Sequence, residues 1–148
     1  MISNGMYVIS SRSGDRRGAA TITWLSQASF KPPLIMAAIR SDSNVFACLS
    51  ESRIAAVHML GSHQKDLARK FLATTEVENG TINGEPFVDG STSAPVFLSS
   101  PAHVECQVRD LIDSGGDHVL VIMEVVDATY REDAPPLLIA NTPWKYGG

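Results

Sequence analysis

Residues 21–34 of this chain are Thr21-Ile22-Thr23-Trp24-Leu25-Ser26-Gln27-Ala28-Ser29-Phe30-Lys31-Pro32-Pro33-Leu34. Small polar and bulky apolar side chains nearly alternate along this segment until the double proline ends it. Such alternation predicts a β-strand with one face toward a core and the other toward solvent or a ligand. The polar face would carry hydroxyls, a carboxamide and an indole, but no carboxylate, His or Cys. It suits a flat, polar-edged, phosphorylated ligand better than bond cleavage; the alternative is an ordinary half-buried strand, since Thr is common in strands.

The composition limits the classes of protein to which this chain can belong. The chain has 148 residues, 44% hydrophobic and 19% charged, which predicts one domain over residues 1–148 with a core of its own. A net charge of -4 without an extended basic patch argues against a nucleic-acid partner. No apolar run is long enough to span a bilayer, and the N-terminus lacks a signal-peptide pattern. Cys48 and Cys106 show no pairing motif, so we expect buried free thiols in a soluble, cytoplasmic protein.

The rest of the chain alternates short apolar runs with turn residues. Two short helices are expected at 45–49, after a cluster of N-cap residues at 41–44, and at 62–71 with Ser62 as the cap. Residues 75–93 are rich in Gly, Asn and Thr and predict a long loop with little structure. Six to eight strands predict a β-barrel or sandwich; besides the opening segment they are expected at 6–11, 34–39, 54–60, 95–98, 102–112, 118–128 and 137–140.

Several familiar chemical motifs are absent from the sequence. There is no G-x-G-x-x-G or Walker A loop and no G-x-S-x-G elbow. The four His and two Cys do not have zinc-ligand spacing, so no metal is expected. These absences leave a β-protein with ligand-binding surfaces, whose chemistry would come from a bound cofactor.

Taken together and in order, the segments resemble one known family. They are 6–11, 21–34, 55–60, Gln64 with Leu67, Ala68 and Phe71, 102–106, Gly116-Asp117-His118 and Tyr146-Gly147-Gly148. This series resembles the flavin reductase-like, FMN-binding split-barrel family, which includes small reductase partners of two-component monooxygenases. The resemblance implies a mostly β split barrel of the Greek-key type with two short helices. It also implies a homodimer with FMN near the subunit interface.

The resemblance implies a cofactor site as well. Ser43 and Asn44 fall where the family often contacts the FMN phosphate, and Arg69 or Lys70 where a basic residue adds to that contact. His118 falls near the open flavin face, where a nicotinamide would stack; the alternative is a turn histidine hydrogen-bonded to backbone. The isoalloxazine edge and ribityl chain would be held by the segment's Thr21, Ile22, Thr23, Trp24, Ser26, Gln27, Ala28 and Ser29.

Other aromatic and titratable residues receive structural roles in this interpretation. Trp24 is expected to pack beside the flavin rather than to take part in chemistry, and His58 to be a strand residue. Trp144 and Tyr146 are expected to be terminal anchors or dimer contacts.

The chain departs from the family pattern at Gly18-Ala19, where an Asn is common. It departs again at Asp42-Ser43-Asn44-Val45, which lacks the Lys or Thr that many members use near the phosphate, and both departures concern flavin affinity.

Three functions remain open at this point. The first is an NAD(P)H-dependent FMN reductase that transfers a hydride from nicotinamide to flavin N5 and supplies reduced flavin to a partner such as a monooxygenase. The second is an electron-transfer flavoprotein that keeps its FMN and takes electrons from a protein. The third is a split-barrel oxidase acting on a small substrate such as pyridoxine phosphate, which would need more basic residues than the sequence offers.

Overall fold

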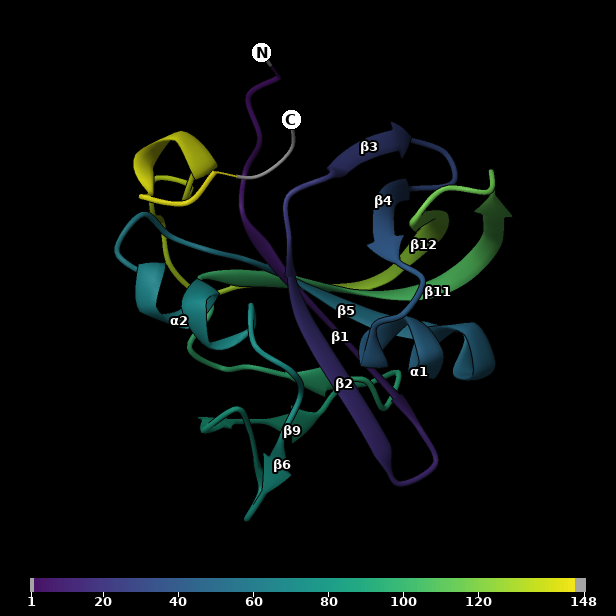
Figure 1. Cartoon of the computed structure of the whole chain (residues 1–148), viewed down its shortest axis with the longest axis horizontal. Helices are drawn as coiled ribbons and strands as arrows, with labels where there is room; N and C mark the ends of the chain where they lie inside the picture. The colour runs from purple at the N-terminus through teal and green to yellow at the C-terminus, as the bar shows by residue number, and fades with distance from the viewer. Residues whose placement is uncertain (1, 146–148) are drawn as a thin grey trace.

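A curled antiparallel sheet of seven strands forms the body of the computed structural model, which describes residues 2–145 (Figure 1). The strands lie in the order β2-β1-β5-β11-β12-β4-β3, and every neighbouring pair is antiparallel. Their bounds are Tyr7–Ser13 (β1), Arg16–Ile22 (β2), Leu25–Ser29 (β3), Leu34–Arg40 (β4), Ile54–Met59 (β5), Ala102–Asp113 (β11) and His118–Tyr130 (β12).

The two edge strands of this sheet, β2 and β3, are consecutive in the chain. Only Thr23 and Trp24 lie between them, so the Cα atoms of Ile22 and Leu25 are at most about 11 Å apart. A seven-stranded sheet can satisfy that limit only by curling until its edges approach each other. The edges approach without pairing, which makes the sheet a split barrel. This confirms the predicted fold class and corrects the single strand expected from Thr21 to the double proline, which breaks at Thr23 and Trp24.

The β1–β2 hairpin is tighter than the sequence suggested. Strand pairing continues to Ser13 opposite Arg16, so the turn consists of Gly14 and Asp15 alone rather than residues 12–18. Gly14 has a φ of +59°, the left-handed backbone that a type II′ turn needs at its first central residue.

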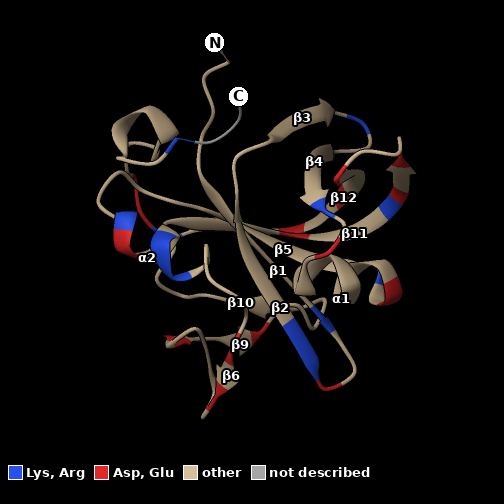
Figure 2. Ribbon diagram, in the orientation of Figure 1, with Lys and Arg blue, Asp and Glu red and all other residues tan. Residues whose placement is uncertain are grey.

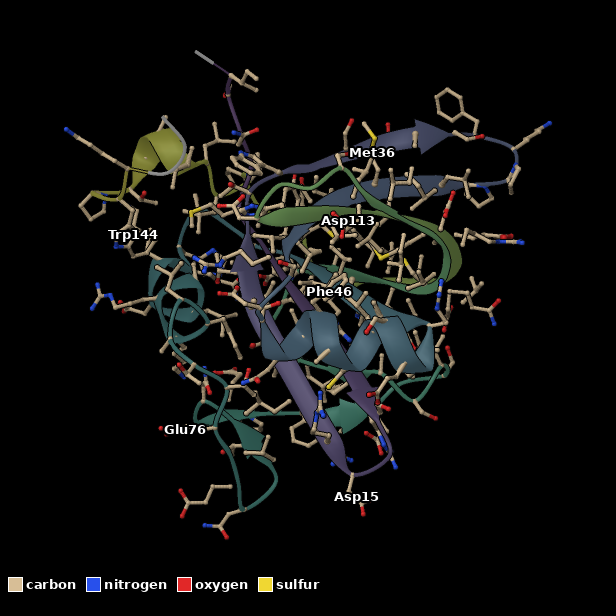
Figure 3. The ribbon with its side chains drawn as sticks, turned by 45° about the vertical axis from the view of Figure 1, so that its right-hand side comes forward. Asp15, Met36, Phe46, Glu76, Asp113 and Trp144 are labelled. Carbon is tan, nitrogen blue, oxygen red and sulfur yellow. The ribbon has the colours of Figure 1, made fainter. Side chains whose placement is uncertain are left out.

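Helix α1, Asn44–Ser52, closes one side of the barrel. Ser43 is its N-cap, and Val45 and Leu49 pack into the main core with Ile9 and Val121. Phe46 is partly buried against the same core and rises from the helix toward the sheet in Figure 3. The helix predicted at 45–49 is confirmed and extends to Ser52.

A second apolar cluster joins the ends of the chain to α2, Lys65–Lys70. Phe71, Phe97 and Leu137 lie fully buried there, and Trp144 packs against the cluster beside α2 (Figure 3). The predicted cap Ser62 is wrong. Gln64 precedes the helix, and its amide accepts from Gly61 N and donates to Ser99 O. The strand expected at 137–140 is wrong: a short 3₁₀ helix, Ile139–Asn141, follows Leu137. Tyr146 lies outside the described residues.

The segment predicted as an unstructured loop contains short strands. Asn79-Gly80 and Asn83-Gly84 both have positive φ at each residue, which is the type I′ turn that Asn-Gly favours. The prediction failed because these dipeptides were taken for loop composition rather than for two hairpins that bury Ile82 completely. The strands are Val77–Glu78 (β6), Thr81–Ile82 (β7) and Glu85–Pro86 (β8), followed by Val88–Asp89 (β9) paired with Pro95–Val96 (β10).

Charged residues of both signs are interspersed over the molecule. Figure 2 shows basic segments on β2 and α2 and acidic ones at β6 and β9. Within residues 2–145, no helix combines the length and apolar character needed to cross a membrane. Cys48 and Cys106 are buried free thiols as predicted, and burial raises the pKa of Cys106 to about 12.

His58 is a buried hydrogen-bonding residue of β5, as expected. Phe97 N donates to its Nε2 at 3.1 Å, so the proton must sit on Nδ1, which donates to Val8 O at 3.0 Å. Burial lowers the pKa of His58 from 6.5 to about 3. The folded state therefore keeps this imidazole neutral where the unfolded chain would protonate it.

Acid should destabilise the fold through His58. Its contribution to stability is fully present above about pH 6.5, the unfolded pKa, and is lost as the pH falls from there toward 3, by up to about 1.4 kcal/mol per pH unit. Urea unfolding at pH 7.5, 6.0 and 5.0 should show a shallower pH dependence in His58→Gln than in the wild type. His63→Gln, at a histidine that is 60% exposed, should keep the wild-type slope; an unchanged slope in His58→Gln would contradict this assignment.

Candidate functional site

A cavity of about 430 Å³ lies against the outer edge of β2, within the size range of small-molecule sites. Three segments form its walls: β2 itself, the connection from β4 to α1, and the chain that follows α2. The lining residues are Ala19, Ala20, Thr21, Arg40, Asp42, Ser43, Asn44 and residues 71–75.

The wall formed by residues 71–75 is bonded directly to the exposed edge of β2. Thr21 N donates to Phe71 O at 2.9 Å, and Ala19 N donates to Thr75 Oγ1 at 3.2 Å. The Thr21 hydroxyl donates to Ala68 O at 2.7 Å, so toward a ligand it can act only as an acceptor. These bonds satisfy an edge that would otherwise expose its polar groups, and they hold the cavity open between strand and wall.

The N-terminus of α1 faces the same cavity. The hydroxyl of Ser43 accepts from Phe46 N at 3.2 Å and donates to Arg40 O at 2.8 Å. This cap fixes the first turn of α1, where backbone N–H groups have no partner within the helix and the helix dipole is positive. Asn44, the first helical residue, lines the cavity beside Ser43, so an anionic group would be stabilised here.

Gly18 determines how closely α1 approaches β2. A Cβ on this residue would lie 2.6 Å from Val45 N and 2.7 Å from the carbonyl carbon of Asn44. The strand backbone thus touches the first turn of the helix, and only glycine leaves room for it. Sequence reasoning noted Gly18 only for the Asn it replaces; the close contact was not visible without the structure.

Gly18→Ala should therefore push the first turn of α1 away from β2. We expect a loss of about 1–3 kcal/mol in unfolding free energy, the usual cost of overpacking, measured by urea denaturation. Gly116→Ala is the matched control, because nothing lies within 4 Å of the Cβ it would add. Equal stability of the two variants would show that the contact at Gly18 relaxes without cost.

One ion pair lies at the mouth of the cavity. Arg40 holds Asp42 in a bidentate contact, Nε to Oδ1 at 2.9 Å and Nη2 to Oδ2 at 2.7 Å. The guanidinium keeps the pKa of Asp42 below its usual value. Among the described residues that line the cavity, these two carry the only formal charges.

His118 and Trp24 meet at the split in the barrel, although 94 positions separate them in the sequence. Their ring centroids are 4.7 Å apart at an interplanar angle of 48°. His118 lies opposite Arg40 in the β12–β4 register, and its Nδ1 donates to Asp117 Oδ1 at 2.7 Å. That contact holds the pKa of Asp117 below its usual value, so the imidazole is oriented by a carboxylate beside the cavity mouth.

Residues 1–146 match the family model for the flavin reductase like domain. The chain belongs to this family. An NADH:FMN oxidoreductase of Rhodococcus qingshengii is 31% identical over 144 residues, covering 90% of this chain and 70% of that protein. The chain also matches two Synechocystis diflavin flavoproteins and spans only 21% and 22% of their length.

Solved structures of flavin reductases share the fold. The NADH:FAD oxidoreductase SgcE6 of Streptomyces globisporus C-1027 superposes with a TM-score of 0.83 at 24% identity, covering 99% of this chain and 87% of that one. BorF, the flavin reductase component of a bacterial two-component tryptophan halogenase, gives 0.79 at 22% identity, covering 93% and 86%. The family recognised from the sequence is confirmed.

The cavity of this flavin reductase-like chain suits a flavin nucleotide in its donor chemistry. Ser43 and the first turn of α1 lie at one wall and Thr74 at another, whereas Ala20 and Phe71 are apolar lining residues. Thr23 is 4% exposed, and its Oγ1 has no hydrogen-bond partner among the described residues. A buried hydroxyl without a partner is costly unless a ligand supplies one, so the residues present fit such a cofactor.

The structure places the predicted flavin residues in three groups. Thr21, Ser43 and Asn44 line the cavity beside β2. Trp24 and Ser26 line a second cavity of about 250 Å³ on β3 and β4, and Met36 lines the same cavity. Ile22 is buried in the main core, Gln27 and Ala28 are exposed on β3, and Ser29 is half-buried.

The two basic candidates of α2 lie outside both cavities. Arg69 contacts Asp66 at 3.4 Å, and Lys70 contacts Glu85 at 2.8 Å. The cation that does line the cavity is Arg40, which sequence reasoning missed. Its position at the end of β4, three residues before the cap of α1, is a signal that could have identified it.

Proposed function

We propose that this flavin reductase-like chain is an NAD(P)H-dependent FMN reductase. The observation that carries the proposal is the cavity beside β2, whose lining includes the capped start of α1 and Arg40. Arg40 lies opposite His118 in the β12–β4 register, and His118 packs against Trp24. When bound there, FMN would accept a hydride from the nicotinamide at N5 and carry the electrons onward.

In this proposal the chain's own residues bind and orient rather than exchange protons. Asn44 and the first-turn N–H groups of α1 bind the phosphate, and Ser43 positions them as the helix cap because its own donors are engaged by Arg40 O. Thr21, Thr23 and the polar residues of β3 hold the edge of the ring system, and Trp24 and His118 border the face on which the nicotinamide stacks. Correct stacking and distance supply much of the acceleration in such a transfer, which agrees with a site that has no strong base aimed into it.

The names of relatives support the choice of FMN and the existence of a partner. The Rhodococcus relative is an NADH:FMN oxidoreductase, and an Agrobacterium relative is an FMN reductase using NADH. BorF serves a two-component enzyme.

We propose that residues 1–148 form one domain in the cytoplasm that supplies reduced flavin to a monooxygenase-type or other electron-accepting partner. We further propose a homodimer, because two large apolar side chains are exposed: Trp24, which lines the second cavity, and Phe30, which follows β3.

Anaerobic reduction of the protein with added FMN tests the proposal. NADH and NADPH are added in separate experiments, and the visible flavin bands are followed. Fast bleaching is expected and would identify the preferred nicotinamide. Tight FMN binding through gel filtration without bleaching would instead indicate an electron carrier, and the absence of any flavin binding would refute the site.

Thr23→Val should weaken FMN binding without loss of stability. Its hydroxyl has no partner in the described protein, so folding loses nothing, whereas the ligand loses one hydrogen bond, about three- to tenfold in affinity. Flavin fluorescence quenching gives the affinity and urea unfolding the stability. Thr21→Val is the contrast: it should lose about 1 kcal/mol of stability, because its hydroxyl donates to Ala68 O. Unchanged FMN affinity in Thr23→Val would count against the site.

His118→Ala should slow flavin reduction by nicotinamide about ten- to a hundredfold through lost orientation, while FMN binding stays within twofold. Stopped-flow reduction per bound flavin and fluorescence quenching separate the two effects. His63→Ala, at an exposed histidine after β5, is the control. If FMN binding falls while the rate per bound flavin holds, His118 is structural.

A further inference from the structure

The charge pattern at the mouth of the β2 cavity is unusual for a site that would take a phosphorylated ligand. Its one lining cation among the described residues, Arg40, is already engaged at two nitrogens by Asp42. A guanidinium presents a planar fork that binds a carboxylate or a phosphate with the same two-point geometry. Asp42 therefore occupies the Nε–Nη2 edge of Arg40, which is one edge at which a guanidinium can bind a phosphate at two points.

This ion pair can exchange partners. The side chains of Arg40 and Asp42 are 60% and 67% exposed, and pairs this exposed are weak because water and salt compete with them. A phosphate dianion carries more charge and more acceptor oxygens than one carboxylate. Displacing Asp42 is thus feasible, and it would open the Nε–Nη2 edge of the guanidinium to the ligand.

The backbone holds the ion pair next to the start of α1. Arg40 O accepts from both Ser43 N, at 3.2 Å, and Ser43 Oγ, at 2.8 Å. Ser41 N donates to Asp117 O at 3.1 Å, which ties the same turn to β12. Residues 40–43 are therefore one compact unit, and the guanidinium, the carboxylate and the helix cap stay at one end of the cavity.

We propose that Asp42 competes with the flavin phosphate for Arg40, and so sets how strongly the site prefers phosphorylated over unphosphorylated flavin. The inference rests on the proposed flavin site. Competition of this kind lowers the affinity for FMN without affecting recognition of the ring. The site is thereby suited to a flavin that enters and leaves rather than one that is permanently held.

Asp42→Asn tests the competition directly, by fluorescence quenching of FMN and of riboflavin with the full chain. We expect FMN to bind about three- to tenfold more tightly, with riboflavin unchanged, and the gain to shrink as salt is raised. Asp15→Asn removes the same charge at the β1–β2 hairpin tip, labelled in Figure 3, and should change neither affinity. Melting temperatures check that both variants fold.

The double variant Arg40→Gln/Asp42→Asn distinguishes two ways in which Asp42 could weaken FMN binding. Asp42 could compete with the phosphate for Arg40, or its negative charge could simply repel the phosphate. If Asp42 acts by occupying Arg40, Asp42→Asn should give no FMN gain in the Arg40→Gln background. A gain that persists there, an equal gain for riboflavin, or an unchanged ratio of the two affinities would each overturn the inference and leave the flavin site standing. Failure of the wild-type protein to bind either flavin would refute the proposed function itself.

Discussion

The two-residue link between β2 and β3 is the constraint on which the rest of the structure depends. Thr23 and Trp24 join strands that lie at opposite edges of one sheet. Because so short a link forbids a flat sheet, the strands between these edges must wrap around the apolar interior that contains Ile9, Val57 and Val121. Trp24 O also accepts from Ala38 N at 3.0 Å, which fastens the link to β4 and keeps the edges near each other without pairing.

The cavity follows from that incomplete closure. Within residues 2–145 the outer edge of β2 has no strand partner, and its polar groups bond to Phe71 O and to the Thr75 hydroxyl instead. A wall held by separate bonds leaves space where a strand would have filled it. The link also places Trp24 beside His118, whose partner in the β12–β4 register is Arg40, so the fold and the candidate site are connected through the same residues.

Much of the fold was predictable from the sequence because it depends on local signals. Apolar runs gave β4, β5, β11 and β12 close to their observed bounds, and Ser43 marked the start of α1. The break at Thr23 and Trp24 was missed, although the adjacent apolar residues Trp24 and Leu25 interrupt the alternation of side chains there. The strands β6, β7 and β8 were missed, although Asn79-Gly80 and Asn83-Gly84 are the sequence signals of the two turns that join them.

The candidate site was less accessible to sequence reasoning than the fold. Resemblance to a family located Thr21, Ser43, Asn44 and His118, which the structure brings to one region. It also pointed to Arg69 and Lys70, whose charges contact Asp66 and Glu85 instead. Arg40 and the wall at 71–75 escaped notice because their role arises from contacts between segments far apart in the chain.

The attachment of the cavity wall, residues 71–75, affects how the binding site can evolve. Phe71 and Thr75 anchor the wall to β2, and three residues, 72–74, bridge the anchors beside the cavity. Insertions or replacements within that bridge would reshape the binding volume while the sheet and both anchors stay intact. Proteins descended from this chain can therefore bind ligands of different sizes while the barrel stays the same. The architecture and the pocket can evolve separately.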